Sequence, residues 1–263
     1  MLNEVDRVMK TPRARYAIVR PVPDSYDHCV RTSGEKIDVA LAKTQHREYC
    51  KVLQRLGLKL IWAKGDNTLP DSCFVEDTAV ILGGKAVVCN MKVKSRAKEV
   101  VEVARVLENL KDVRYIKPPA AIDGGDVLKI EDRVLVGLTG RTNMHAVHQL
   151  KEIVGKDSFE VVPVKVRNVL HLKSACTYLG DSHVIVAEGC FDADVLRGYP
   201  KIVVPRGEEC AADCLAVNGA VLMAKGYPKT RKLIEREGFA VTELDVSEFR
   251  KGDGALTCLS ILC

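Results

Sequence analysis

Short apolar runs come in pairs along the chain, with a tight turn between the two members of each pair. The pairs cover residues 76–89, 123–137, 171–187 and 212–224, and their turns contain Gly83-Gly84, Glu131-Asp132, Gly180-Asp181 and Asn218-Gly219. Two β-prone runs joined by such a turn are typical of a β-hairpin. The pattern therefore predicts four hairpins.

Segments with helical periodicity follow the hairpins. The segment that begins at Ser95 carries Val100, Val103, Ala104 and Leu107 on one predicted helix face. Further helices are expected to begin at Arg141 and at Tyr227-Pro228, and the second of these should end at Gly238. A shorter helix is expected over 192–197. The repeating unit predicted from the sequence is strand-strand-helix.

The polar residue that opens each unit recurs at a nearly constant interval. These residues are Asp77, Asp123, His171, Asp213 and Cys258, separated by 46, 48, 42 and 45 residues. A period near 45 indicates a closed, radially repeated architecture, although an ordinary α/β sheet with coincidental spacing is the alternative. The last unit has one strand and the run at 16–22 lacks a hairpin. We therefore expect the two ends of the chain to share one blade, with the opening residues around a common axis.

Composition narrows the possible functions. The chain has 263 residues, is 47% hydrophobic and carries Lys+Arg 40 against Asp+Glu 35, with these charges spread along its length. Aromatic residues make up 5%, so the basic and aromatic pattern of a nucleic-acid-binding protein is missing. No apolar run reaches the ~18 residues of a membrane helix. The N-terminal segment, 1–15, lacks an apolar export core, so a cytoplasmic location without nucleic-acid or membrane partners is expected.

The ten cysteines form neither a C-x-x-C motif nor a structural-zinc spacing. Taken alone, Cys258 lies in an apolar run that is typical of a packed core thiol. Its register with Asp77, Asp123 and His171 favours a catalytic site instead. A guanidinium group is a planar cation that carboxylates bind bidentately, and its carbon requires a strong nucleophile such as a thiolate. Histidine can protonate the departing amine and later activate water.

These motifs, taken in order, resemble those of the dimethylarginine dimethylaminohydrolases, members of the guanidino-modifying (pentein) superfamily. The resemblance runs nearly end to end and rests on the blocks LPD (69–71), FVED (74–77), DGGD (123–126), GLTGRTN (137–143), LHLKS (170–174) and LTCLS (256–260). It implies a five-bladed β/α propeller as a single domain over 1–263. It also implies that the C–N bond of a guanidino group is hydrolysed, most simply converting dimethylarginine to citrulline and dimethylamine.

The resemblance implies a role for each of a set of residues. Cys258 would be the nucleophile, His171 the general acid/base and Asp123 the acid that orients His171. The expected substrate contacts are Glu76, Asp77 and Asp253 for the guanidinium, Asp71 for the α-amino group, Arg96 and Arg141 for the α-carboxylate, and backbone groups at Val30 and Gly252. A mobile loop over 21–34 would cover the site.

Several alternatives remain at this stage. Arginine deimination shares the amino acid end of the substrate, amidino transfer replaces water by an amine, and a non-catalytic binding protein could share the fold. The expected partner is a small guanidino amino acid, and the expected assembly is a monomer or homodimer. No metal or organic cofactor is expected, and a zinc ion held by Cys258 and His171 would be inhibitory.

Overall fold

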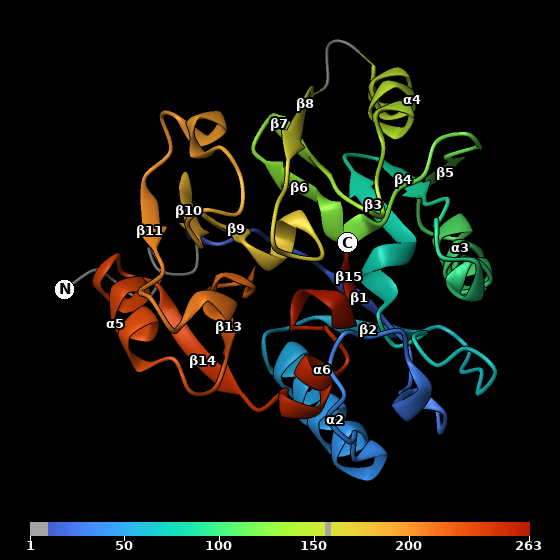
Figure 1. The fold of residues 1–263 in the computed structure, drawn as a ribbon, viewed down its shortest axis with the longest axis horizontal. Coiled ribbons are helices and arrows are strands. Elements are labelled where there is room, and N and C mark those ends of the chain that lie inside the picture. The colour runs from blue at the N-terminus through green and yellow to red at the C-terminus, as the bar shows by residue number, and fades with distance from the viewer. Residues whose placement is uncertain (1–9, 156–158) are drawn as a thin grey trace.

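A computed structural model describes residues 10–155 and 159–263 and contains five three-stranded sheets around a central axis (Figure 1). Part of the N-terminal segment discussed above, residues 1–9, lies outside the described residues. In spatial order from the axis outward, the sheets are β15 (Ile261–Leu262), β1 (Tyr16–Val19) and β2 (Lys59–Trp62); β3 (Ala79–Leu82), β4 (Lys85–Val88) and β5 (Asp112–Tyr115); β6 (Val127–Ile130), β7 (Arg133–Leu138) and β8 (Glu160–Lys165); β9 (Cys176–Gly180), β10 (His183–Val186) and β11 (Lys201–Val203); and β12 (Leu215–Val217), β13 (Ala220–Ala224) and β14 (Ala240–Leu244). The five-bladed β/α propeller is confirmed.

Every blade has the same connectivity. An inner strand pairs antiparallel with the middle strand, as in Val80 opposite Val87, and this confirms the four predicted hairpins. The middle strand then pairs parallel with a third strand, as in Val87 beside Arg114. The full unit is therefore strand-strand-helix-strand, one outer strand longer than the unit read from the sequence.

The turn between β12 and β13 shows how turn residues set the pairing of two strands. Asn218 and Gly219, between β12 and β13, both have positive φ angles, of 46° and 92°. A two-residue turn of this kind requires φ above zero at both central positions, which asparagine and glycine adopt at low cost. The turn thereby sets the register that places Val217 opposite Ala220.

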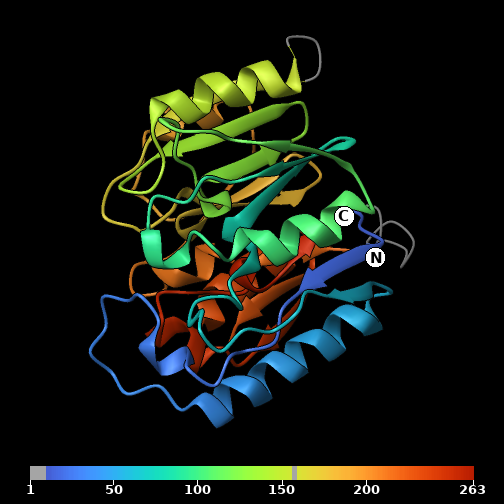
Figure 2. The ribbon, with the colours of Figure 1, turned by 90° about the vertical axis from the view of Figure 1, so that its right-hand side faces the viewer.

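The helices cover the outside of the ring (Figures 1 and 2). They are α2 (Val39–Arg55), α3 (Val100–Glu108), α4 (Met144–Val154), α5 (Pro228–Arg236) and the short α6 (Ser247–Lys251). In α3 the buried residues are Val103, Ala104 and Leu107, as the periodicity predicted. The Asn143 side chain caps α4 by accepting a hydrogen bond from the Ala146 amide at 3.1 Å. The expected short helix is a 3₁₀ turn, η6 (Ala193–Leu196).

The two ends of the described chain close the ring, as predicted. β1 pairs antiparallel with β15, so that Ala17 lies opposite Leu262. The amides of Arg15 and Tyr16 both donate to the Cys263 carbonyl, at 2.7 and 2.9 Å. One blade therefore contains strands from both ends of the chain.

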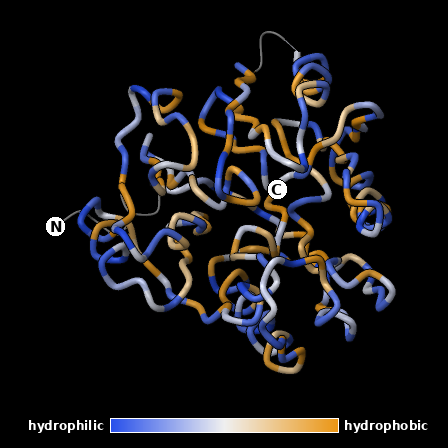
Figure 3. The backbone as a smooth tube through the Cα atoms, viewed as in Figure 1, coloured by the Kyte–Doolittle hydropathy of each residue, from blue (hydrophilic) through white to orange (hydrophobic). Residues whose placement is uncertain are grey.

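The core lies between the strands and the outer helices, where buried strand residues such as Val87 pack with Val147 and Leu150 of α4. Figure 3 colours the hydrophobic residues orange along the chain. The inner strand β3 and the middle strand β4 are mostly buried, whereas the outer strand β5 is largely exposed. Each described helix is too short or too polar to span a membrane.

Candidate active site

A short 3₁₀ turn precedes the inner strand of each blade at the same end of the ring. These turns are η2 (Val75–Thr78), η4 (Gly124–Asp126), η5 (Leu172–Ser174), η7 (Glu209–Ala212) and η8 (Thr257–Leu259). Around the axis, η2 packs against η4 and η8, and η5 packs against η4 and η7. Asp77, Asp123, His171, Asp213 and Cys258 lie in these turns or directly beside them, and all five are buried. The convergence predicted from the 45-residue period is present.

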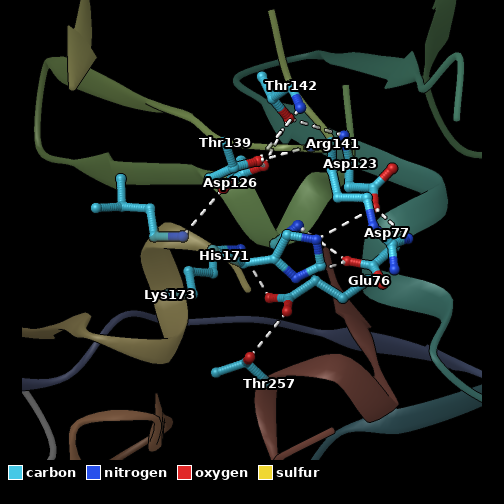
Figure 4. Close-up of polar contacts among 12 residues, drawn as sticks. Glu76, Asp77, Asp123, Asp126, Thr139, Arg141, Thr142, His171, Lys173 and Thr257 are labelled. Atoms are coloured by element: carbon cyan, nitrogen blue, oxygen red, sulfur yellow. Dashed lines mark hydrogen bonds and ion pairs between the residues drawn. The ribbon is translucent and has the colours of Figure 1, made fainter. Parts of the chain in front are cut away.

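The imidazole of His171 lies between two carboxylates (Figure 4). Its Nε2 is 3.2 Å from Asp123 Oδ2, and its Nδ1 is 3.8 Å from Asp77 Oδ1. Burial favours the neutral ring, but Asp77 and Asp123 outweigh burial and raise the pKa of His171 to about 9. Near neutral pH the ring is therefore an imidazolium that can donate a proton.

Gly125 makes this position of the ring possible. A Cβ atom at residue 125 would lie 2.7 Å from His171 Nδ1 and 2.9 Å from Asp77 Oδ1. The Gly125 amide also donates to Asp77 Oδ1 at 3.2 Å. The paired glycines of the DGGD motif thus allow the backbone to approach the ring where a side chain would displace it.

Asp126, for which the sequence predicts no role, fixes the loop that carries His171. Its Oδ1 accepts the Leu172 amide at 3.0 Å, and its Oδ2 accepts the hydroxyls of Thr139 and Thr142 at 2.7 and 2.6 Å. Burial raises the pKa of Asp126 to about 6. The second acid of the DGGD motif therefore positions the histidine loop, and its place in that motif was the available signal.

Cys258 lies in η8 within a negatively charged environment. Burial is the main cause that raises the pKa of the Cys258 thiol well above its usual value. The carboxylates of Asp213, Glu76 and Asp77 raise it further. The free site therefore holds a protonated thiol. A cation bound among these carboxylates would reverse their influence and favour the thiolate, which is the nucleophilic form.

Both carboxylate oxygens of Glu76 accept a hydrogen bond from another side chain. Lys173 Nζ donates to Glu76 Oε1 at 2.7 Å, and the Thr257 hydroxyl donates to Glu76 Oε2 at 2.8 Å (Figure 4). Burial opposes the charge of Lys173, yet Glu76 outweighs burial and raises the pKa of Lys173. Lys173 and Thr257 belong to the LHLKS and LTCLS blocks but were not assigned a role from sequence.

The two arginines predicted to bind a carboxylate have different surroundings. Arg96 is buried, with its Nη1 2.9 Å from Asp77 Oδ2 and its Nη2 2.9 Å from Glu99 Oε2. Arg141 is more open, with a side chain 15% exposed and its Nη1 3.4 Å from Asp123 Oδ2. Arg141 is therefore the arginine better placed to reach a ligand, while Arg96 primarily neutralises the acids around it.

The loop over 21–34 is fastened onto the site by two acids. Asp71 accepts the Val30 amide with its two oxygens at 3.1 and 3.2 Å. Asp253 accepts the Thr32 amide at 2.6 Å and the Thr32 hydroxyl at 2.8 Å. Gly252 lies beneath the loop, since a Cβ there would be 2.5 Å from the Tyr26 hydroxyl. The predicted contacts Val30, Asp71, Gly252 and Asp253 are thus brought together by the loop.

Asp77, Asp123 and His171 also have the spacing of a metal site, because their candidate ligand atoms all lie within 4.8 Å of one another. Cations are already present there. Arg96 pairs with Asp77 and Arg141 pairs with Asp123. Together with the imidazolium, these guanidinium groups balance the negative charge that would attract a metal ion. The arrangement suits proton transfer better than metal binding.

Known proteins resemble this chain in both fold and sequence. Dimethylarginine dimethylaminohydrolases of Pseudomonas aeruginosa and Streptomyces coelicolor are 32% and 35% identical to it, covering 86% and 95% of this chain and 90% and 97% of their own lengths. A solved structure of the Pseudomonas aeruginosa enzyme, a cysteine-to-serine mutant with citrulline bound, superposes with a TM-score of 0.91 at 29% identity, covering 96% of this chain and all of its own.

A more distantly related solved structure supports the fold but not the function. The N-terminal domain of a cyanobacterial arginine dihydrolase superposes with a TM-score of 0.86 at 20% identity, covering 95% of this chain and 97% of its own.

The sequence profile described as "N,N dimethylarginine dimethylhydrolase, eukaryotic" matches residues 18–201. With that match over more than half the chain, and with relatives at 32% and 35% identity, the chain belongs to the dimethylarginine dimethylaminohydrolase family.

Proposed function

We propose that this protein hydrolyses the guanidino group of methylated arginines, converting dimethylarginine to citrulline and dimethylamine. The observation that carries the proposal is the imidazolium of His171, held between Asp77 and Asp123 in the same ring of turns that contains Cys258. A proton donor, a thiol and several carboxylates are what guanidine cleavage requires. The family membership of the chain supports the same reaction.

The first half of the reaction follows from the charges. A guanidinium cation binds against Asp77 and Glu76, which makes it easier for Cys258 to lose its proton to solvent. The Cys258 sulfur then bonds to the guanidinium carbon. His171 donates its proton to the substituted nitrogen, the C–N bond breaks, and the amine leaves. A thiouronium bound to Cys258 remains.

The second half uses His171 as a base. Neutral after the first step, its imidazole accepts a proton from water as the water oxygen attacks the thiouronium carbon. The C–S bond breaks, the remaining hydroxyl proton passes to the Cys258 thiolate or to solvent, and citrulline is released. Asp123 keeps the ring oriented throughout, because its carboxylate lies 3.2 Å from Nε2.

The amino acid end of the substrate is assigned to the loop side of the site. We propose that Asp71 and the Val30 backbone bind the α-amino group, that Arg141 binds the α-carboxylate and that Arg96 assists. Gly252 and Asp253 would support the closed loop. A cytoplasmic location and a monomeric or dimeric state are further expectations of this proposal.

Citrulline release tests the proposal directly. Purified protein is incubated separately with dimethylarginine, monomethylarginine and arginine, and citrulline and the released amine are measured. We expect faster turnover of the methylated substrates and no turnover by Cys258→Ser, with normal turnover by the matched thiol control Cys263→Ser. Faster turnover of arginine would replace the proposal by deimination, and activity of Cys258→Ser would overturn the mechanism.

A further inference from the structure

Lys173 is a partly buried cation that the reaction described above does not use. It lies in η5, two residues after His171, and its side chain is 19% exposed. Its Nζ donates to Glu76 Oε1 at 2.7 Å (Figure 4). Lysine is rarely buried to this extent without an anionic partner. Among residues 10–155 and 159–263, Glu76 is the one acid within 4.0 Å of this Nζ.

The other oxygen of Glu76 is held by the turn that carries the nucleophile. The Thr257 hydroxyl donates to Glu76 Oε2 at 2.8 Å, and Thr257 directly precedes Cys258 in η8. The Glu76 side chain is 11% exposed. Through these two hydrogen bonds its carboxylate connects η2, η5 and η8, which belong to three different blades.

The charge of Lys173 also acts on Cys258. Burial lowers the pKa of Lys173, but Glu76 outweighs burial, and Asp213 and Cys258 raise the pKa further. Because the attraction between two charges is mutual, the Lys173 ammonium favours the thiolate form of Cys258. The Glu76 carboxylate has the reverse effect on the thiol. In the free protein the ammonium and this carboxylate therefore oppose each other at the nucleophile.

A cavity on the axis of the ring can supply water to the ammonium. It has a volume of about 210 Å³ and is lined by all five inner strands, for example by Val80 of β3 and Leu128 of β6, and by Glu76, Lys173 and Thr257. An ammonium has three N–H donors, and Glu76 accepts one of them. Water in a polar space of this size can accept the others. Lys173 can therefore stay charged when Glu76 binds a second cation.

We propose that Lys173 is a positioning residue for the thiol: it pairs with Glu76 in the free protein, and it stabilises the Cys258 thiolate once a bound guanidinium engages Glu76. This role deepens the proposed function and rests on it for the part played by Glu76. Each oxygen of Glu76 has a second lone pair with which to accept from a guanidinium. That cation offsets the carboxylate, so the Lys173 ammonium no longer has an equal opposing charge. Substrate and protein then both favour loss of the Cys258 proton to solvent.

Replacing Glu76 by glutamine imitates the engaged carboxylate and tests the proposal without catalysis. The experiment uses Cys263→Ser protein, in which the tryptic peptide 252–263 has Cys258 as its single cysteine. Alkylation by iodoacetamide at pH 8.5 is followed by mass spectrometry of this peptide. Glu76→Gln should speed alkylation at least about tenfold, because an acid is lost while the ammonium stays. Adding Lys173→Met, which removes the ammonium, should abolish most of that gain.

The matched control is a second lysine at the same cavity. Lys129 lies on β6, and its Nζ is 5.3 Å from the centroid of the Phe159 ring. Lys129→Met in the Glu76→Gln protein should leave alkylation fast, and so should Lys173→Arg, which keeps the charge. If Lys173→Met also left alkylation fast, the charge of Lys173 would not act on the thiol, and the inference would be overturned.

Two further comparisons cover the remaining outcomes. If Glu76→Gln does not fold, Lys173→Met alone should be alkylated at least about threefold more slowly than Lys129→Met, and equal rates would overturn the inference. With dimethylarginine, Lys173→Met should lower kcat/KM at least about tenfold and Lys173→Arg at most about threefold. Full activity of Lys173→Met would likewise overturn the inference. Alkylation as expected, without citrulline release by the original protein, would overturn the proposed function alone.

Discussion

Replacing Asp123 by asparagine tests whether carboxylates hold His171 in its protonated form. Asparagine keeps the shape of the side chain and removes a charge that lies 3.2 Å from Nε2, while Asp77 remains 3.8 Å from Nδ1. In the original protein these carboxylates outweigh burial and raise the pKa of His171 to about 9. The substitution should therefore lower the pKa of His171.

The size of the change follows from Coulomb's law. A unit charge at this distance contributes roughly 1 kcal/mol at the dielectric constant of water and roughly 5 kcal/mol at an effective constant of 20. At about 1.4 kcal/mol per pKa unit, the pKa of His171 should fall by about 1 to 4 units. At pH 7 the variant would lose part or most of its imidazolium, and kcat/KM should fall accordingly.

The titration of the His171 ring in ¹⁵N-labelled protein measures this pKa directly, with His171→Gln used to assign its signals among the six histidines. Asp253→Asn, which removes an acid that binds the loop, is the matched control and should leave the midpoint of the titration unchanged. An unchanged midpoint in Asp123→Asn would refute the charge argument. A lower midpoint in both variants would mean that loop closure, and not Asp123, sets the pKa.

The same shift makes stability depend on pH. The folded pKa of His171, about 9, lies above the ordinary value of 6.5. The stabilisation is therefore complete below pH 6.5 and is lost as the pH rises through 9, and it amounts to at most about 3 kcal/mol. The decrease in Tm between pH 6 and pH 9.5 should be smaller in Asp123→Asn than in the original protein.

Two further substitutions test the surroundings of the ring. Gly125→Ala would place a carbon 2.7 Å from His171 Nδ1, so kcat/KM should fall at least about tenfold with the fold retained, and an unchanged rate would contradict the close approach. Arg141→Ala should raise KM about 10- to 100-fold and also raise the pKa of His171, because it removes a cation 3.4 Å from Asp123. A lower kcat with unchanged KM would contradict its binding role.

The sequence predicted the inner part of each blade better than the outer part. Inner and middle strands such as β3 and β4 are buried, short and joined by a tight turn, so their pattern is local and visible. The outer strands are more exposed, and three of the four residues of β5 are exposed. Their pairing with the middle strand also depends on a helix that intervenes in sequence. Neither the pattern nor the neighbouring residues identify such a strand.

In the candidate site, too, some residues could be predicted from the sequence and others could not. Asp77, Asp123, His171 and Cys258 were visible because they recur in register, and a family resemblance added their roles. Lys173 and Thr257 were not visible, because their importance arises from Glu76, which belongs to a different blade. Contacts between blades leave no periodic trace in the sequence, so only the folded structure shows which side chains share a hydrogen bond.

Closure of the ring by β1 and β15 has a consequence for biosynthesis. Ala17 pairs with Leu262, 245 positions later in the sequence, so this contact can form only after β15 has been synthesised. Cys258 immediately precedes that closing strand. A nascent chain that has made the other four blades therefore still lacks Cys258, the proposed nucleophile, and this thiol meets His171 and the acids only when the ring closes.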